Sequence, residues 1–180
     1  ISIVLIITHI NILAQYRHPI SFANKEYDQF QRFDNYTTKD GLPSNYIHRI
    51  FQDKDGFLWL ATDNGLSRYD GYTFTNFQPV DGDSTSISSR NVTSIAQDND
   101  GLIWVGTENG LNRLDPVKGK FKRFFKENSG ILKDNYIRAL LVCSDGYLWI
   151  DCANATLTQL NTKKLEPTFF SRPGKASTTY

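Results

Sequence analysis

Short apolar runs alternate with turns rich in aspartate and glycine along this chain. Residues 57–62 hold five apolar side chains in succession, a run too short for a helix and typical of a strand buried on both faces. The flanking segments 53–56 and 63–65 are turn sequences, because aspartate bonds its own backbone and glycine accepts positive φ. The pattern predicts one antiparallel sheet of four strands, at 47–52, 57–62, 66–69 and 72–77.

This unit is repeated along the chain. Trp59, Trp104 and Trp149 each end the phrase Asp-Gly-x-x-Trp, and both gaps between them are 45 residues. A fixed period of this size indicates one supersecondary unit copied in tandem. The third copy is degenerate: it contains one inserted residue and loses the Thr, Gly and Arg of the other copies to Cys152, Thr156 or its neighbours, and Gln159.

The repeat predicts an all-β fold made of β-propeller blades. A four-stranded sheet that is apolar on both faces needs a neighbouring sheet on each side, and radial packing of such sheets is the propeller. A helical repeat is excluded because no stretch of about ten residues has a 3.6-residue period; a flat β-solenoid usually has a shorter period. We expect about three blades, at about 45–78, 90–125 and 135–170, preceded by an outer strand at 30–36.

The repeat resembles a known family. Asp55 to Asp70 and Asp100 to Asp115 both read Asp-Gly-x-x-Trp-x-x-Thr-x-x-Gly-Leu-x-Arg-x-Asp, and Gly41-Leu42-Pro43-Ser44-Asn45 precedes the first copy. This phrase is similar to the two-component regulator propeller repeat. The resemblance implies the periplasmic sensor region of Bacteroidetes-type hybrid two-component systems, which recognises glycan breakdown products. It also implies that the full-length protein forms a homodimer, and that any histidine kinase activity and the membrane span lie in a C-terminal region absent from this chain.

Composition and the ends of the chain add two expectations. A net charge of +1, with acidic and basic residues interspersed, argues against a nucleic-acid partner for this segment. Residues 1–15 resemble the remnant of a secretory signal peptide, followed by a linker at 16–29; a buried first strand is the alternative interpretation of the apolar start.

Three repeats and one strand are too few to close a ring, since propellers have about four to eight blades. We therefore expect the N-terminal piece of a longer propeller, whose residues 171–180 run into the next blade. An open arc of this kind leaves one apolar blade face uncovered, which favours association.

Most residues with candidate chemistry have a structural explanation. Asp53-x-Asp55-Gly56 and its copy at 98–101 share the start of a calcium loop, but the third ligand and the final glutamate are missing, so a turn is expected and no metal site is predicted. Sialidase-type Asp-boxes place their Asp two before the Gly, where Lys54, Asn99 and Ser144 stand here. The three histidines form no cluster with a cysteine in sequence.

The aromatic and basic positions of the repeat are also expected to be structural. The three tryptophans could stack on sugars, yet their place in the most apolar strand favours the core between blades. Arg68 and Arg113 recur at one strand position and are expected to be structural too. Ligand groups should instead lie in the loops 81–90 and 126–135, which differ between copies and could border the central channel. No individual ligand-binding residue is assigned.

Cys143 and Cys152 are predicted to be two free thiols. Hairpin pairing places Cys152 opposite about Ile137, six residues from Cys143, which is roughly 20 Å and beyond disulfide reach.

Two functions are consistent with the sequence. The first is a non-enzymatic sensor propeller with an oligosaccharide ligand, no cofactor and no catalytic residue. The second is a fragment of a propeller enzyme, a glycan hydrolase or lyase, which requires an acidic pair or a His/Tyr constellation that the sequence does not show.

Overall fold

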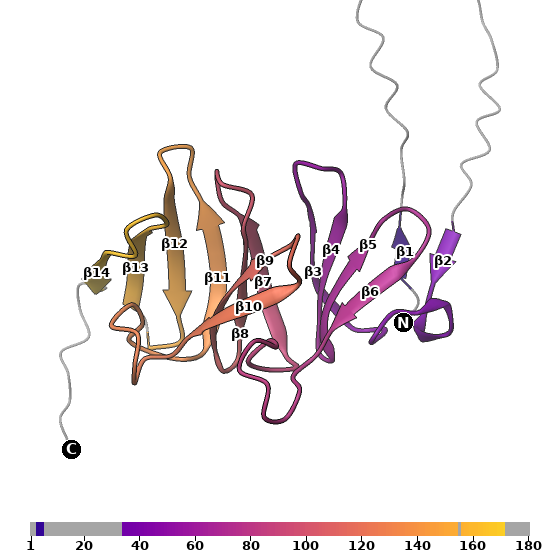
Figure 1. Cartoon of the computed structure of the whole chain (residues 1–180), viewed down its shortest axis with the longest axis horizontal. Coiled ribbons are helices and arrows are strands. Elements are labelled where there is room, and N and C mark those ends of the chain that lie inside the picture. The colour runs from indigo at the N-terminus through magenta and orange to yellow at the C-terminus, as the bar shows by residue number, and fades with distance from the viewer. Residues whose placement is uncertain (1–2, 6–33, 155, 172–180) are drawn as a thin grey trace, which may run out of the picture.

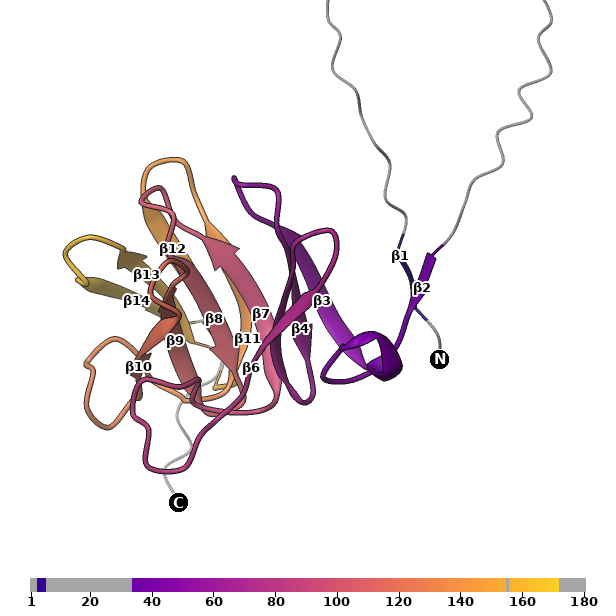
Figure 2. The same ribbon diagram turned by 45° about the vertical axis from the view of Figure 1, so that its right-hand side comes forward.

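The computed structural model describes residues 3–5, 34–154 and 156–171, and these form three four-stranded antiparallel sheets and one two-stranded ladder. The sheets lie side by side in chain order, with β14 at one end of the row and β2 at the other (Figure 1). In the view turned by 45°, β2 stays at one end of the row and the two sheets farthest from it overlap (Figure 2). The prediction of an all-β fold built from propeller blades is confirmed. Within the described residues the one helical element is the short 3-10 turn η1 (Thr38–Asp40).

Each sheet runs from an inner strand, which lies next to the inner strand of the neighbouring blade, to an outer strand. Blade 1 comprises β3 (Ile47–Gln52), β4 (Leu58–Thr62), β5 (Gly65–Tyr69) and β6 (Phe74–Phe77). Blade 2 comprises β7 (Val92–Gln97), β8 (Ile103–Thr107), β9 (Gly110–Asp115) and β10 (Lys120–Phe124). Blade 3 comprises β11 (Ile137–Val142), β12 (Tyr147–Cys152), β13 (Thr156–Asn161) and β14 (Pro167–Ser171).

The three inner strands carry the same irregularity. In each of β3, β7 and β11 the pairing with the second strand shifts by one residue, at His48, Thr93 and Arg138. Such a bulge leaves its extra residue outside the ladder and re-aims that side chain. The Thr93 hydroxyl reaches the next blade, where it donates a hydrogen bond to the Ile137 carbonyl oxygen at 2.6 Å.

The apolar core lies between the blades. Trp59 and Trp104 are fully buried, each in the apolar cluster of one interface, so the prediction of a structural role for these two tryptophans is confirmed. Each also stacks on an outer-strand phenylalanine of its own blade: Trp59 on Phe77 at 6.0 Å and Trp104 on Phe124 at 5.8 Å between ring centroids. The blades therefore stabilise one another through the most apolar strand of each repeat.

The segment that precedes each inner strand contributes one buried aliphatic side chain to the core. Leu42, Ile87 and Leu132 are spaced by 45 residues and are 5%, 0% and 3% exposed. Ile87 joins the cluster between blades 1 and 2, and Leu132 joins the cluster between blades 2 and 3.

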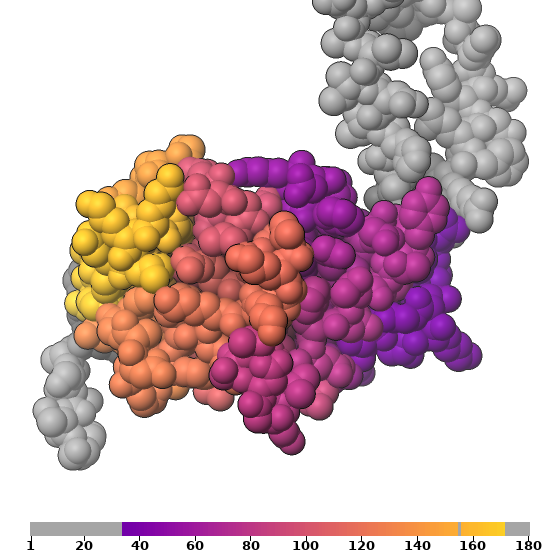
Figure 3. Space-filling view, viewed as in Figure 1, coloured from indigo at the N-terminus to yellow at the C-terminus, as the bar shows by residue number. Residues whose placement is uncertain are grey.

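Within residues 34–154 and 156–171, the last blade has one side that no other blade covers, and we call this side the free face. It is a hollow of about 390 Å³ lined by Ala139, Leu140, Leu141, Cys143, Trp149, Asp151 and Leu157. Trp149 is only half-buried there, unlike the two equivalent tryptophans, and Leu141 is 62% exposed. Figure 3 shows this blade, in orange and yellow, at one end of the molecule. The expected uncovered blade face is therefore present.

The opposite end of the row is partly covered by the lead-in segment. Tyr36 of β2 (Asp34–Tyr36) packs edge-on against Phe74 with ring centroids 5.6 Å apart, and its hydroxyl lies 2.8 Å from that of Tyr69. The interface between blades 1 and 2 contains the same edge-on arrangement, between Phe77 and Phe121 at 5.7 Å. Tyr36 thus takes the place that an outer-strand phenylalanine of a preceding blade would take.

The predicted signal peptide and linker lie outside the described residues, as do residues 30–33 of the predicted outer strand and Ala155. The exception is β1 (Ile3–Leu5), which pairs with β2 in an antiparallel ladder. No helix among the described residues is long and apolar enough to cross a membrane.

We expect the middle blade to be the most resistant to local opening. Both of its faces are covered, whereas blade 3 exposes its free face, and repeat units are stabilised mainly by their interfaces. Amide hydrogen exchange should show stronger protection in 102–105 than in 147–150. Equal or reversed protection would show that interface burial does not set the order of stability.

Candidate functional site

A polar cleft lies between the outer strands of blades 1 and 2, and we call it the rim cleft. Its volume is about 410 Å³. The lining side chains include Asn76, Phe77, Gln78, Asp83, Thr85 and Lys120, with Phe121 beside them. The cleft is therefore built from β6, from β10 and from the first half of the 81–90 loop, one of the two loops predicted to carry ligand groups.

Hydrogen bonds to β10 hold this loop in place. The Phe121 N–H donates to the Thr85 carbonyl oxygen at 2.8 Å. The Arg123 guanidinium donates to the carbonyl oxygens of Asp83 and Ser86, both at 2.7 Å, and to the Ser86 hydroxyl at 2.6 Å. The first half of the loop thus lies along an outer strand, and the expectation that it borders the central channel is wrong for this half.

Asp83 is the carboxylate of the cleft. Its Oδ1 accepts hydrogen bonds from the Thr85 hydroxyl at 2.7 Å and from the Thr85 N–H at 2.8 Å. These bonds lower the pKa of the Asp83 carboxyl, with smaller contributions from the positive charges of Lys120 and Arg123. Asp83 is therefore ionised at neutral pH and can accept hydrogen bonds from a ligand.

The blade 1 side of the cleft carries two amides that are fixed by the backbone. The Asn76 amide donates to the Gly41 carbonyl oxygen at 2.8 Å, and the Gln78 amide donates to the Asn64 carbonyl oxygen at 2.9 Å. With Phe77 and Phe121 the cleft combines fixed polar groups and apolar surface, the usual composition of a small-molecule site. Its lining holds one carboxylate, whereas glycoside hydrolysis uses two carboxylates that flank the bond. The arrangement suits binding.

The second predicted loop, 126–135, is not brought to this cleft. It closes on itself: the Asn135 amide donates to the Glu127 carboxylate at 3.0 Å, and its Oδ1 accepts the Lys126 N–H at 2.8 Å. The hydrogen bond from Asn135 lowers the pKa of Glu127. Both loops nevertheless emerge at the same edge of the blades, the lower edge of Figure 1.

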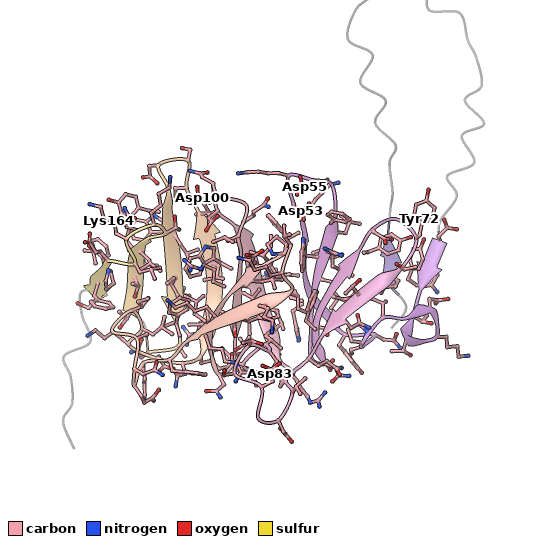
Figure 4. The ribbon with its side chains drawn as sticks, viewed as in Figure 1. Asp53, Asp55, Tyr72, Asp83, Asp100 and Lys164 are labelled. Carbon is pink, nitrogen blue, oxygen red and sulfur yellow. The ribbon has the colours of Figure 1, made fainter. Side chains whose placement is uncertain are left out.

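The aspartate turns lie at the opposite edge, where Figure 4 labels Asp53, Asp55 and Asp100, with Asp83 at the lower edge. The expectation of turns is confirmed, but it missed a second role. The Asp98 carboxylate, 1% exposed, accepts hydrogen bonds from the Trp104 indole N–H at 2.7 Å and from two backbone N–H groups of its own turn. Asp53 does the same for Trp59 at 2.7 Å.

This Asp–Trp hydrogen bond is a structural lock. Its signal in the sequence is an aspartate six residues before the tryptophan, which the third copy replaces with Cys143. No group of three or more His, Cys, Asp or Glu residues suited to a metal ion occurs within the described residues.

The remaining predicted residues are structural. The Arg68 guanidinium lies 4.8 Å from the Phe57 ring centroid, and that of Arg113 lies 5.5 Å from the Trp104 ring centroid, so both arginines pack on aromatic rings. Cys143 and Cys152 are free thiols, as predicted, and Cys152 pairs with Ile137 across the hairpin. Burial raises the pKa of the Cys152 thiol to about 11, which keeps it protonated and unreactive.

Comparison with known proteins identifies the repeat. Residues 41–64 and 86–109 match the sequence model of the family described as two component regulator propeller. A 56-residue part of the chain is 45% identical to histidine kinase P4 from Formosa agariphila. This matched part makes up 31% of this chain and 4% of the kinase. The chain thus spans a small fraction of the length of this relative.

Similar solved structures share the propeller fold. The extracellular domain of BT3049, a hybrid two component system of B. thetaiotaomicron, superposes with a TM-score of 0.70 at 24% identity over 80% of this chain and 21% of that domain. Virginiamycin B lyase from Staphylococcus aureus superposes with a TM-score of 0.61 at 19% identity, over 79% of this chain and 46% of the lyase. At these identities the likeness shows the fold alone.

Proposed function

We propose, on the premise that this chain carries two-component regulator propeller repeats, that it is part of the periplasmic ligand-sensing region of a signal transduction protein and that its ligand is a saccharide. Loops on a rigid scaffold carry recognition, and here the scaffold is an array of blades locked by repeated interfaces. The full-length protein acts as a homodimer in this proposal, and the kinase lies in another part of it.

The rim cleft is the observation that carries the saccharide assignment. Saccharides present hydroxyl groups around an apolar ring face, and a site for them needs fixed donors and acceptors beside apolar surface. The cleft offers the Asp83 carboxylate, the Lys120 ammonium and two anchored amides around Phe77. Its volume of about 410 Å³ is within the range of small-ligand sites.

Isothermal titration of the chain with a panel of neutral, amino and acidic oligosaccharides tests this function. We expect at least one to bind, and Lys120→Ala to weaken that binding by about tenfold, because a hydrogen bond to a charged group contributes roughly 1.5–3 kcal/mol. Lys118→Ala is the matched control, since Lys118 is an exposed lysine of the β9–β10 turn paired with Asp115 at 3.0 Å.

Three results would contradict this proposal. The folded chain could bind no member of the panel. A glycan could bind with equal affinity to the Lys120→Ala and Lys118→Ala variants, which would place the site elsewhere. Finally, turnover of a glycan that one point substitution abolishes would support the enzyme hypothesis instead.

A further inference from the structure

The free face of blade 3 is equivalent, position by position, to the faces that are buried between the other blades. Counting by the repeat, Trp149 corresponds to Trp59 and Trp104, and Leu157 corresponds to Leu66 and Leu111, allowing for the inserted residue. All four of the earlier residues are fully buried in interfaces. The free face therefore continues an established series of blade interfaces and is shaped for another blade.

One position breaks the apolar pattern of this face. Asp151 stands where blade 1 has Ala61 and blade 2 has Gly106. It lines the hollow, and its cross-strand partners Ala139 and Leu157 line it too, so the three side chains share the face. None of the hydrogen bonds or ion pairs within residues 34–154 and 156–171 involves the Asp151 carboxylate.

This position is a point of close approach between blades. A Cβ built on Gly106 would lie 2.7 Å from Cγ2 of Ile137, the first residue of the inner strand of the next blade. A blade with isoleucine at that point would cover the Asp151 carboxylate with apolar surface. Burial of an unpaired charge is strongly unfavourable, whereas burial against a cation with good geometry offsets the lost hydration.

We propose that Asp151 makes the free face selective for its partner blade. The face docks a further copy of this repeat whose inner strand presents a lysine or arginine at the position that Val92 and Ile137 hold in blades 2 and 3. It rejects a second copy of this chain, because the first blade of such a copy presents Ile47 at that position. Asp151 is then a specificity residue that keeps the blades in one order and prevents head-to-tail association.

The other end of the molecule supports this choice of partner. On the side of blade 1 that faces away from blade 2, Tyr36 already occupies the place of an outer-strand aromatic residue, with its ring centroid 5.6 Å from that of Phe74. A second copy that docked there would have to displace it as well as bury Asp151 against Ile47. Both obstacles disfavour the second copy, and neither applies to a further blade with a cationic inner strand.

The test uses the full chain with one more blade, made by inserting a second copy of residues 126–171 between Ser171 and Arg172. Four chains are compared, with Asp151 or Asp151→Ala in the original blade and with isoleucine or lysine at the appended position equivalent to Ile137. Protection of the 148–150 amides against hydrogen exchange and the blue shift of Trp149 emission report docking. In the chains that keep Asp151, lysine at the appended position should raise protection by about tenfold over isoleucine. In the Asp151→Ala chains the preference should be reversed. The resulting coupling between the two positions is within the usual range for contacting residues.

The control is Asp145→Ala, which removes an exposed carboxylate from the preceding turn, outside the free face. It should leave the preference for lysine unchanged. Equal effects of lysine with Asp151 and with Asp151→Ala would overturn the proposal, and so would a lack of added protection in all four chains. Head-to-tail association of the unextended chain, measured by sedimentation velocity, would overturn the rejection of a second copy.

Discussion

Replacing Asp98 with alanine is expected to lower the free energy of unfolding by about 3–4 kcal/mol. The Asp98 carboxylate is buried and accepts three hydrogen bonds, including the Trp104 indole N–H at 2.7 Å. Alanine leaves that indole N–H unsatisfied in the core between blades 2 and 3, and a buried donor without an acceptor costs roughly 1–3 kcal/mol by itself. The loss of the turn's own bonds adds to it. Urea unfolding followed by tryptophan fluorescence gives the value.

Asp55→Ala serves as the control for this lock. Asp55 is an exposed acid in the equivalent turn of blade 1, and its removal should change stability by no more than about 0.5 kcal/mol. A gain-of-lock variant is also available: Cys143→Asp gives Trp149 the acceptor that blade 3 lacks, with a gain of about 1 kcal/mol because Trp149 is half-buried. If Asp98→Ala were no more harmful than Asp55→Ala, the lock would have no energetic role.

Gly65→Ala is expected to cost about 3 kcal/mol, through two additive causes. Gly65 has φ of 114°, a conformation in which a Cβ is strained by about 1–2 kcal/mol. The added Cβ would also overlap the carbonyl oxygen of Phe77 on the outer side of the sheet. The backbone has little room to move away, because the Gly65 N–H donates to the Arg90 carbonyl oxygen at 2.6 Å.

Gly56→Ala separates the two causes. Gly56 also has positive φ, 90°, but a Cβ there would meet nothing within 4 Å. Its substitution should therefore cost only the strain, about 1–2 kcal/mol. Thermal unfolding of both variants gives the comparison. Equal losses would mean that the contact with Phe77 relaxes without penalty.

The architecture could be predicted from the sequence because the same pattern of strands and turns occurs in three copies. The turn residues at 53–56 and 63–65 mark strand ends in a way that local backbone chemistry dictates, and the 45-residue spacing fixes the sheet as the repeated unit. The inner strand 47–52 is predicted with the bounds that the structure has. The two free cysteines follow from strand register alone.

The site could not be predicted to the same depth, since it depends on contacts between segments far apart in sequence. Arg123 holds the loop that contains Asp83, yet the two residues are 40 apart and no local pattern joins them. The sequence does not reveal that Asp98 accepts a hydrogen bond from the Trp104 indole N–H, because a turn is a sufficient explanation for an aspartate at that position. Trp149 repeats the sequence of a core residue but is only half-buried on the free face, because burial depends on packing between blades and not on the repeat alone.

The bulge in each inner strand has a consequence for variation. His48, Thr93 and Arg138 occupy the same height on three equivalent strands, and each stands outside the hydrogen-bonded ladder of its own sheet. Their identities can differ without any change in strand register, so an imidazole, a hydroxyl and a guanidinium are displayed from one invariant backbone. At this position the blades can therefore vary in side-chain chemistry along their inner edge while the backbone of the fold stays the same.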